Sequence, residues 1–297
     1  MRIGTAERDS TFLTQGLALA RILAAGGIEG RVEVLESAAA SIDNARRLHS
    51  GDLDFGFMAA NWIGRARLGE APFTEPIDLR MVAPMNAGPL FFIARADSEL
   101  RTTADLAGKR VVVGPQMSGM AQHARAIFAA LGLGFTDFTP LYLDFAAGAE
   151  ALVAGEADAQ LQCPIPNKVM TELAQRIDVR VLAFAEGDLE KVLERNEAYR
   201  RIVMRKGAIR GLDADVAQPA VVNVLVCHAR APAEMVHSVV RAILAGADEL
   251  GRINPLFLGL RDLFEPLRSA GPAALQFGGV VLHDGALAAY REALLLP

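Results

Sequence analysis

Apolar and polar positions alternate with two different periods along the chain. Short apolar runs typical of strands occur at 53–59, 110–114 and 220–227. Between them lie longer segments, such as 11–25 and 119–131, whose apolar residues recur at helical spacing. Strands that alternate with helices favour mostly parallel sheets covered on both faces. The pattern therefore predicts an α/β protein.

The other predicted elements follow the same alternation. Residues 79–84 and 89–95 are apolar, and residues 201–218, which contain Gly207 and Gly211, are predicted to be irregular. Further strands are predicted at 2–5, 31–36, 139–143, 158–163 and 179–184. Further helices are predicted from Ser41 to Gly51 and at 60–70, 102–106, 147–154, 166–175, 186–198, 232–251 and 284–295.

One joint between a strand and a helix occurs twice. Strand 2–5 enters a polar loop and then a helix at Thr11 or Phe12, and strand 110–114 enters a second loop and a helix from Gly119. The free N–H groups and the dipole at a helix N-terminus favour negative charge. Two such loops indicate two matching lobes with a ligand held between them.

A second pair of segments supports this duplication. Residues 48–55 and 152–159 each read as a helix end, a glycine stop, an acidic turn and the start of a strand. Such joints are common in any α/β protein, but here two different patterns recur in the same order. The interval of about one hundred residues exceeds the ~20–50 residues of a solenoid repeat. We interpret it as an ancestral βα unit used twice.

The chain is long enough for two domains. Its 297 residues match two domains of ~150 residues each, or one large domain. We predict one lobe from 1–95 plus 218–297 and a second lobe from 96–217, with the ligand cleft between them. The apolar run at 220–227 would return the chain to the first lobe.

Composition and charge exclude several classes of protein. Hydrophobic residues make up 52% of the chain and charged residues 22%, which indicates a globular protein. The net charge of -5 and the lack of a basic run argue against nucleic-acid binding. No apolar stretch of ~18 residues predicts a membrane span. Met1 leads directly into the first strand, so we expect either a cytoplasmic protein or a trimmed leader.

The residues that could carry chemistry form no catalytic pattern. Cys163 and Cys227 lie in apolar runs and are predicted to be buried free thiols. No group of His, Cys, Asp and Glu has metal-ligand spacing, and no nucleophile, zinc-protease or Walker pattern is present. We therefore predict no catalytic residue, no metal and no cofactor.

Several motifs resemble one known family. Residues 3–7 and 9–13 are similar to its Gly-Thr-Gly-Ser and Gly-Gly-Thr opening, and residues 41–54 to its Ser-Val-Glu-Asn helix and Gly-Glu-Ala-Asp turn. Residues 105–119 match closely, and residues 282–292 fit its His-Pro-Gly-Ala and Tyr-x-Glu patterns. Over nearly its whole length the chain resembles the TAXI-type solute receptors of TRAP transporters.

The resemblance implies a fold and a function. The fold would be the α/β, two-lobed type II periplasmic-binding-protein (Venus-flytrap) fold with a two-strand hinge. The protein would be an extracytoplasmic, periplasmic receptor that captures a small organic acid or amino acid and delivers it to the membrane subunits of a TRAP transporter. Nucleic acid would not be a partner.

The chain departs from this family at several positions of the expected pocket. Asp9 and Ser10 replace the flexible Gly-Gly of the first loop, and Ala59 and Ala60 replace two polar residues after the third strand. Met120 and Ile209 stand where the family has Thr and Tyr. The scaffold is thus kept while the polar lining is changed.

Candidate ligand contacts lie at strand ends and helix starts, where α/β sheets present their binding groups. Some of these residues have a purely structural alternative. The alternative for Asp9, Ser10, Thr11 and Ser118 is helix capping alone. The alternative for Arg8 is a solvated side chain, and for Trp62 it is packing in the core. The candidates are Thr5, Arg8, Asp9, Ser10, Thr11, Asn61, Trp62 and Asn86 in the first lobe and Ser118, Gly119, Met120, Phe145 and Gln162 in the second.

Two other classes of function stay open at this point. One is a cytoplasmic dehydratase or decarboxylase on the same fold, with Asp9 or Asp144 as acid or base. The other is a cytoplasmic ligand sensor. His283 belongs to a family pattern, but we expect it to be structural rather than catalytic.

Overall fold

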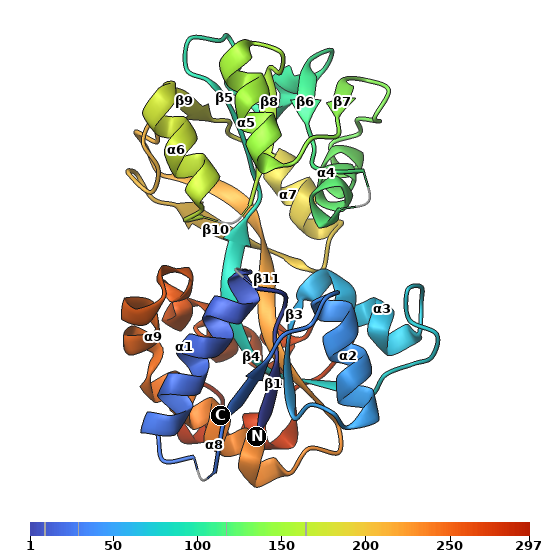
Figure 1. The fold of residues 1–297 in the computed structure, drawn as a ribbon, viewed down its shortest axis with the longest axis vertical. Coiled ribbons are helices and arrows are strands. Elements are labelled where there is room, and N and C mark those ends of the chain that lie inside the picture. Colours follow the sequence, from blue (N-terminus) through green and yellow to red (C-terminus); the bar gives the residue numbers. More distant parts are fainter. Residues whose placement is uncertain (9, 29, 117, 164) are drawn as a thin grey trace. The chain divides into compact units, whose positions relative to one another are not determined.

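The computed structural model describes residues 1–8, 10–28, 30–116, 118–163 and 165–297 (Figure 1). The chain divides into two compact units. Unit 1 comprises Met1–Ala87 and Val222–Pro297, and unit 2 comprises Gly88–Val221. Strands β4 (Leu79–Pro89) and β11 (Val216–His228) each continue from one unit into the other.

Unit 1 contains a mixed sheet whose parallel strands lie together at one side. β1 (Arg2–Gly4) lies between β2 (Glu33–Leu35) and β3 (Phe55–Ala59) and is parallel to both. β11 runs antiparallel to β3 and also pairs with β4. The parallel strands are the ones joined through helices, as the alternating pattern predicts.

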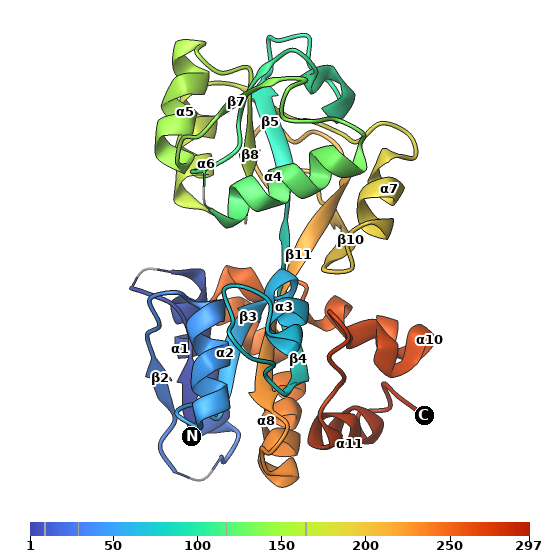
Figure 2. The same cartoon turned by 90° about the vertical axis from the view of Figure 1, so that its right-hand side faces the viewer.

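Helices surround the sheet of unit 1, and Figure 2 shows α2 running alongside β3. Helices α1, α8, α9 and α11 bury apolar faces that include Leu19, Val239, Leu250 and Tyr290. The bounds are α1 (Thr11–Ala25), α2 (Ser41–Ser50), η1 (Ala60–Trp62), α3 (Ile63–Leu68), α8 (Ala233–Ala245), α9 (Ala247–Ile253), η3 (Pro255–Phe257), η4 (Leu260–Leu263), α10 (Pro266–Ala270), η5 (Gly271–Leu275) and α11 (Asp284–Glu292).

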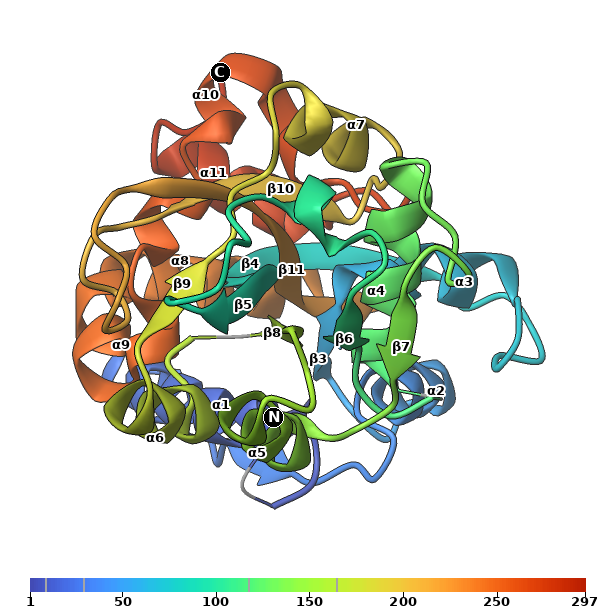
Figure 3. The ribbon, with the colours of Figure 1, turned by 90° about the horizontal axis from the view of Figure 1, so that it is seen from above.

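Unit 2 is built around a second mixed sheet with the strand order β7-β6-β8-β5-β9. β6 is parallel to β7 and β8, whereas β5 is antiparallel to β8 and β9. Helices α5 and α6 lie side by side (Figure 3). The bounds are β5 (Phe91–Arg95), η2 (Thr103–Leu106), β6 (Arg110–Val112), α4 (Gly119–Ala130), β7 (Thr139–Leu141), α5 (Phe145–Ala154), β8 (Ala159–Gln162), α6 (Lys168–Arg176), β9 (Val179–Val181), α7 (Asp188–Glu194) and β10 (Tyr199–Met204).

The structure corrects the prediction that 201–218 is irregular. β10 occupies the start of this segment and pairs antiparallel with β11, with Tyr199 opposite Val221. Tyr199 and Met204 are buried, whereas Arg201 and Val203 between them are exposed. This half-buried strand carries two arginines. They obscure the alternation of apolar and polar residues from which a strand would be predicted.

The predicted helix 232–251 is two helices instead of one. α8 ends and α9 begins at Gly246, which packs tightly against α1. A methyl group on Gly246 would lie only 2.5 Å from Ile22 Cγ2. The break therefore reflects a close approach between helices that the spacing of apolar residues does not reveal.

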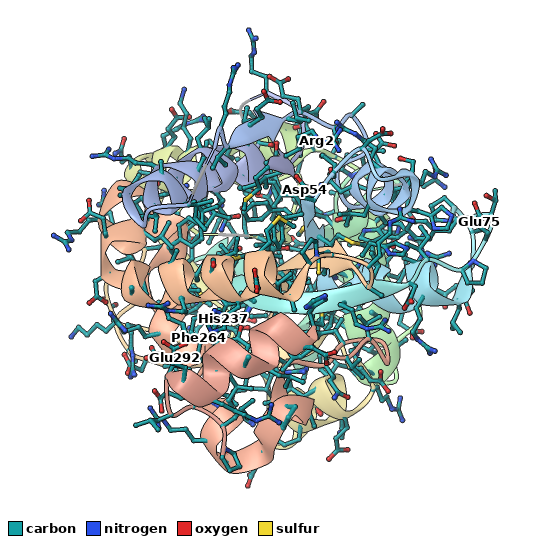
Figure 4. The ribbon with its side chains drawn as sticks, turned by 90° about the horizontal axis from the view of Figure 1, so that it is seen from below. Arg2, Asp54, Glu75, His237, Phe264 and Glu292 are labelled. Carbon is teal, nitrogen blue, oxygen red and sulfur yellow. The ribbon has the colours of Figure 1, made fainter. Side chains whose placement is uncertain are left out.

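The duplicated segments form the same polar clasp in both units. In unit 1 the Arg2 backbone N–H donates to Asp54 Oδ2 at 2.7 Å and the Arg2 guanidinium to the Gly51 carbonyl at 2.7 Å (Figure 4). In unit 2, Arg110 N–H donates to Asp158 Oδ2 at 2.7 Å and its guanidinium to the Gly155 carbonyl at 2.9 Å. Matching interactions at matching positions support duplication beyond the common helix–glycine–strand joint.

One detail of the duplicated joint is reversed between the units. In unit 1 the helix residue is Asn44 and the facing strand residue is Gly56, where a methyl group would lie 3.1 Å from Asn44 Cβ. In unit 2 the helix residue is Gly148 and the strand residue is Gln160, and a methyl group on Gly148 would lie 2.5 Å from Gln160 Nε2. Each joint therefore holds one carboxamide, which comes from the helix in unit 1 and from the strand in unit 2.

Candidate functional site

Polar residues gather at one edge of the sheet in unit 1. The parallel strands β1 and β3 end there, and Asn223 of β11 pairs with Ala59, the last residue of β3. Because ligands of α/β sheets bind at the carboxyl ends of the strands, this edge is the candidate site surface of unit 1.

The loop after β1 places its polar groups at the start of α1. Ser10 is the N-cap, and its Oγ accepts a hydrogen bond from Leu13 N–H at 3.2 Å. Thr11 and Arg8 are exposed, and Asp9 lies outside the described residues. Thr5 is fully buried and its hydroxyl donates to the Leu35 carbonyl at 2.9 Å, so it supports the loop from below.

Asn44 holds this edge together. Its Nδ2 donates to the Thr5 carbonyl at 2.7 Å and to the Phe57 carbonyl at 2.9 Å, while its Oδ1 accepts from the Ser37 hydroxyl at 2.6 Å. One buried side chain thus ties the end of β1 to β3. The sequence analysis did not identify Asn44 as a residue of the site.

Three carboxamides converge beside the loop. Asn86 of β4, predicted as a ligand contact, accepts from Gln15 Nε2 at 3.0 Å and from Asn223 Nδ2 at 3.1 Å. Gln15 is fully buried, and its Oε1 has no hydrogen-bond partner among the described residues. Gln15 and Asn223 were missed, although a glutamine one turn after Thr11 on the apolar face of α1 is an unusual residue that could have drawn attention.

The segment after β3 carries a partly buried aromatic and cationic pair. Asn61 and Trp62 lie in η1, and the Arg65 guanidinium lies 5.3 Å from the centroid of the Trp62 ring. The Oδ1 atom of Asn61 is buried and has no described partner. Asn61 and Trp62 were predicted as contacts, whereas Arg65 was missed.

Unit 2 repeats the capped loop of unit 1. Ser118 is the N-cap of α4, and its Oγ accepts from Ala121 N–H at 3.2 Å. Gly119 is exposed, and a methyl group there would meet nothing within 4 Å. Gly114 lies two residues after the end of β6 and has φ +88°, and a methyl group on it would lie 2.6 Å from Met120 Cβ. The loop therefore needs a glycine at this position.

Phe145 and Gln162 lie at the start of α5 and the end of β8. Asp144 caps α5 by accepting from Ala147 N–H at 2.8 Å, so the helix begins at Phe145, two residues earlier than predicted. The Phe145 carbonyl accepts from Gln160 Nε2 at 3.0 Å. Gln162 is fully buried, and its Nε2 has no partner among the described residues.

Three titratable groups of unit 2 and one of unit 1 are held in their neutral forms. His123 Nδ1 lies 2.8 Å from the Tyr199 hydroxyl, and burial lowers the pKa of His123 to about 4. Burial, and then the nearby Cys163, raise the pKa of Tyr199. Burial also raises the pKa of the Cys163 and Cys227 thiols to about 12, so neither is a thiolate at neutral pH.

The predicted residues that the structure describes are divided between the two units. Within the described ranges, no group of three or more His, Cys, Asp or Glu could hold a metal ion. Over those same residues, no helix has the length and apolar character to cross a membrane. Cys163 and Cys227 are both free, as predicted; Cys227 is also buried as predicted, whereas Cys163 is only partly buried.

Solved structures of solute-binding proteins share this fold. A TctC solute-binding protein from Polaromonas matches with a TM-score of 0.59 and 16% identity, covering 99% of this chain and 95% of that chain. A putative periplasmic sulfonate-binding protein, SsuA, from Methylobacillus flagellatus matches with a TM-score of 0.57 and 14% identity, covering 99% and 94%.

A third match is the periplasmic aliphatic sulphonate-binding protein SsuA from Escherichia coli, with a TM-score of 0.53 and 17% identity over 100% of this chain and 88% of that chain. At these identities the matches show the fold, which is the predicted type II periplasmic-binding-protein fold. The model of the NMT1-like family matches residues 3–293, nearly the whole chain, and the protein therefore belongs to the NMT1-like family.

Proposed function

We propose that the protein is the solute-binding subunit of a membrane transporter. It captures a small organic acid or amino acid between its two units, and a hinge formed by β4 and β11 closes around the solute. The observation that carries this proposal is the duplicated, serine-capped loop: each unit directs the N-terminus of a long helix from the carboxyl end of a central parallel strand. Each such helix end attracts negative charge, and in the proposed closed form both would meet one anionic group of the solute.

The transporter class and the location are part of the same proposal. The motifs at 3–13, 41–54, 105–119 and 282–292 support a TRAP transporter of the TAXI type, whose membrane subunits would be the partners. The two sulfonate-binding structures with this fold are described as periplasmic, which supports a periplasmic location here. Catalytic residues are not required for this function.

The first experiment is a thermal-shift screen of carboxylates, sulfonates, amino acids and aromatic acids. A solute at ~100 times its Kd stabilises the folded protein by ~2.7 kcal/mol, which raises Tm by several degrees. Mass spectrometry then shows whether the bound solute is recovered unchanged, as a binding protein requires. A solute that is consumed would favour the enzyme alternative, with Asp9 and Asp144 as the first residues to replace.

Replacement of the loop hydroxyls should weaken binding. Thr11→Ala and Ser118→Ala should each lower the affinity for the solute about 5- to 10-fold, because each removes one hydrogen bond worth ~1 kcal/mol. Isothermal titration calorimetry measures the change. Ser118→Ala also removes a helix cap worth ~1 kcal/mol, so Thr102→Ala, which removes the capping hydroxyl of η2, is the matched control.

Thr102→Ala should lose similar stability and keep its affinity for the solute. If Thr11→Ala and Ser118→Ala also kept full affinity, the two loops would not form the binding site.

Closure around the solute should be measurable in solution. Saturation with the solute should reduce the radius of gyration in small-angle X-ray scattering, because the two units approach each other when the hinge closes. Titration below and above Kd, with a non-binding analogue as the control, separates closure from a change in solvent contrast. Identical scattering curves at zero and saturating solute would contradict the hinge mechanism.

A further inference from the structure

Arg65 is the partly buried arginine whose guanidinium lacks a hydrogen-bond acceptor or a counter-ion among the described residues. The arginines Arg8, Arg21 and Arg291 also lack an acceptor in the described chain, but all three are exposed and can be solvated by water. The neighbouring Arg67, by contrast, donates to the Gly278 carbonyl at 2.8 Å. Arg65 is therefore set apart by burial without a partner.

The position of Arg65 is fixed by the segment that carries it. α3 follows η1 without a break, since Trp62 and Ile63 both have right-handed helical backbone angles. Residues three apart on a helix lie on the same side, which brings the guanidinium over the Trp62 ring at 5.3 Å. Stacking on an indole holds a guanidinium in place while its N–H groups stay free to donate.

Gly64, between these two residues, packs against a separate loop of unit 1. A methyl group on Gly64 would lie 3.1 Å from Gly278 Cα, so the short helix is anchored on that side. The segment also begins directly after Ala59, at the sheet edge that carries Asn86 and Asn223. Arg65 is thus a cation held against Trp62, on the segment that leaves this edge of the sheet.

A partly buried charge without a partner is costly, and proteins keep such a group where a counter-charge arrives. A guanidinium offers parallel N–H donors that match the oxygens of a carboxylate or a sulfonate. We infer that Arg65, stacked on Trp62, forms the subsite that selects the acid group of an oxyanion-bearing solute. This inference rests on the proposed function. It adds to that function the negative charge of the solute and the residue that binds the charged group.

The test uses pairs of acids and neutral amides on the full chain. The probes are glutamate, succinate, benzoate, taurine and benzenesulfonate, each compared with its amide or sulfonamide, and affinities are measured by calorimetry. The wild-type protein should bind an acid more tightly than its neutral partner. Arg65→Gln should weaken binding of the acid about 10- to 100-fold and leave binding of the neutral partner unchanged.

Two further variants make the result specific. Arg65→Lys keeps the charge but loses the planar fork, so it should show a smaller loss than Arg65→Gln. Arg21→Gln removes another unpartnered arginine of unit 1 and should bind as the wild type does. Whether the carboxylates or the sulfonates bind more tightly distinguishes the two kinds of acid group.

The outcomes separate the two proposals. If the wild type binds an acid and Arg65→Gln binds it equally well, the Arg65 subsite is wrong and the solute-binding function stands. If the neutral partners bind the wild type as tightly as the acids do, the Arg65 subsite is also wrong and the solute-binding function also stands. If no solute binds the wild type, the proposed function fails and the subsite fails with it. If Arg65→Gln does not fold, Arg65→Lys decides, and an unchanged affinity for the acid overturns the subsite.

Discussion

Asn44→Ala should lower the free energy of unfolding by about 3–5 kcal/mol. The substitution leaves the buried carbonyls of Thr5 and Phe57 without their donor and the Ser37 hydroxyl without its acceptor. Each buried polar group that loses its partner costs ~1–3 kcal/mol. Urea unfolding followed by circular dichroism measures the change.

The same variant should also lose affinity for the solute, because the loop between Thr5 and α1 is no longer tied to β3. Asn196→Ala is the matched control: Asn196 also donates from Nδ2 to a carbonyl, that of Val192, but it is only partly buried and makes one such bond. The control should lose ~1 kcal/mol or less. A loss for Asn44→Ala no larger than that of the control would contradict the role assigned to Asn44.

Tyr290→Ala should lower the free energy of unfolding by about 4–5 kcal/mol. Tyr290 is fully buried, packs against Phe264 with ring centroids 5.8 Å apart, and donates its hydroxyl to the Val82 carbonyl at 2.7 Å. Truncation of a buried aromatic residue costs ~3–5 kcal/mol through lost burial and the cavity, and the orphaned carbonyl adds to this cost. Thermal and urea unfolding both measure it.

Tyr290→Phe separates the two contributions. It keeps the ring and removes only the hydrogen bond, so it should cost about 1–2 kcal/mol. Equal losses for Tyr290→Phe and Tyr290→Ala would show that the hydroxyl, rather than the ring, dominates. A Tyr290→Ala protein as stable as the wild type would contradict the packing described here.

The pattern around Tyr290 resembled a family motif, and in this chain it is structural. His283 caps α11 by accepting from Gly285 N–H at 3.1 Å. A methyl group on Gly285 would overlap the backbone of Ala233 at the start of α8. Glu292 pairs with His237 of α8 at 2.8 Å, as the labels in Figure 4 show. The motif therefore joins α11 to α8.

Elements with local capping residues were well predicted from the sequence. α1 begins and ends where predicted, at Thr11 and Ala25, because Ser10 caps it and Gly26 stops it. α2 ends at Ser50 because Gly51 adopts the left-handed conformation, with φ 84°. Such residues act through their own neighbours, so their effect can be predicted without a tertiary structure.

Features that depend on distant partners were not predicted. β10 forms only because β11 supplies its hydrogen bonds, and the break at Gly246 depends on Ile22 of another helix. In the candidate site, the loops after β1, β3 and β6 were identified from their sequences. Gln15 and Arg65 were missed because the unpartnered Oε1 of Gln15 and the unpartnered guanidinium of Arg65 become visible only after the chain has folded.

The reversed carboxamide of the duplicated joint constrains how the two units could have diverged. Introducing Asn at Gly148 while Gln160 is present would place two amides where only one fits, since even a methyl group would lie 2.5 Å from Gln160 Nε2. Replacing Gln160 by Gly first would leave the Phe145 carbonyl without its donor. Either order of single steps passes through a chain with two amides or none at this joint. The two changes are therefore coupled, so no single substitution can move the carboxamide from one side of the joint to the other.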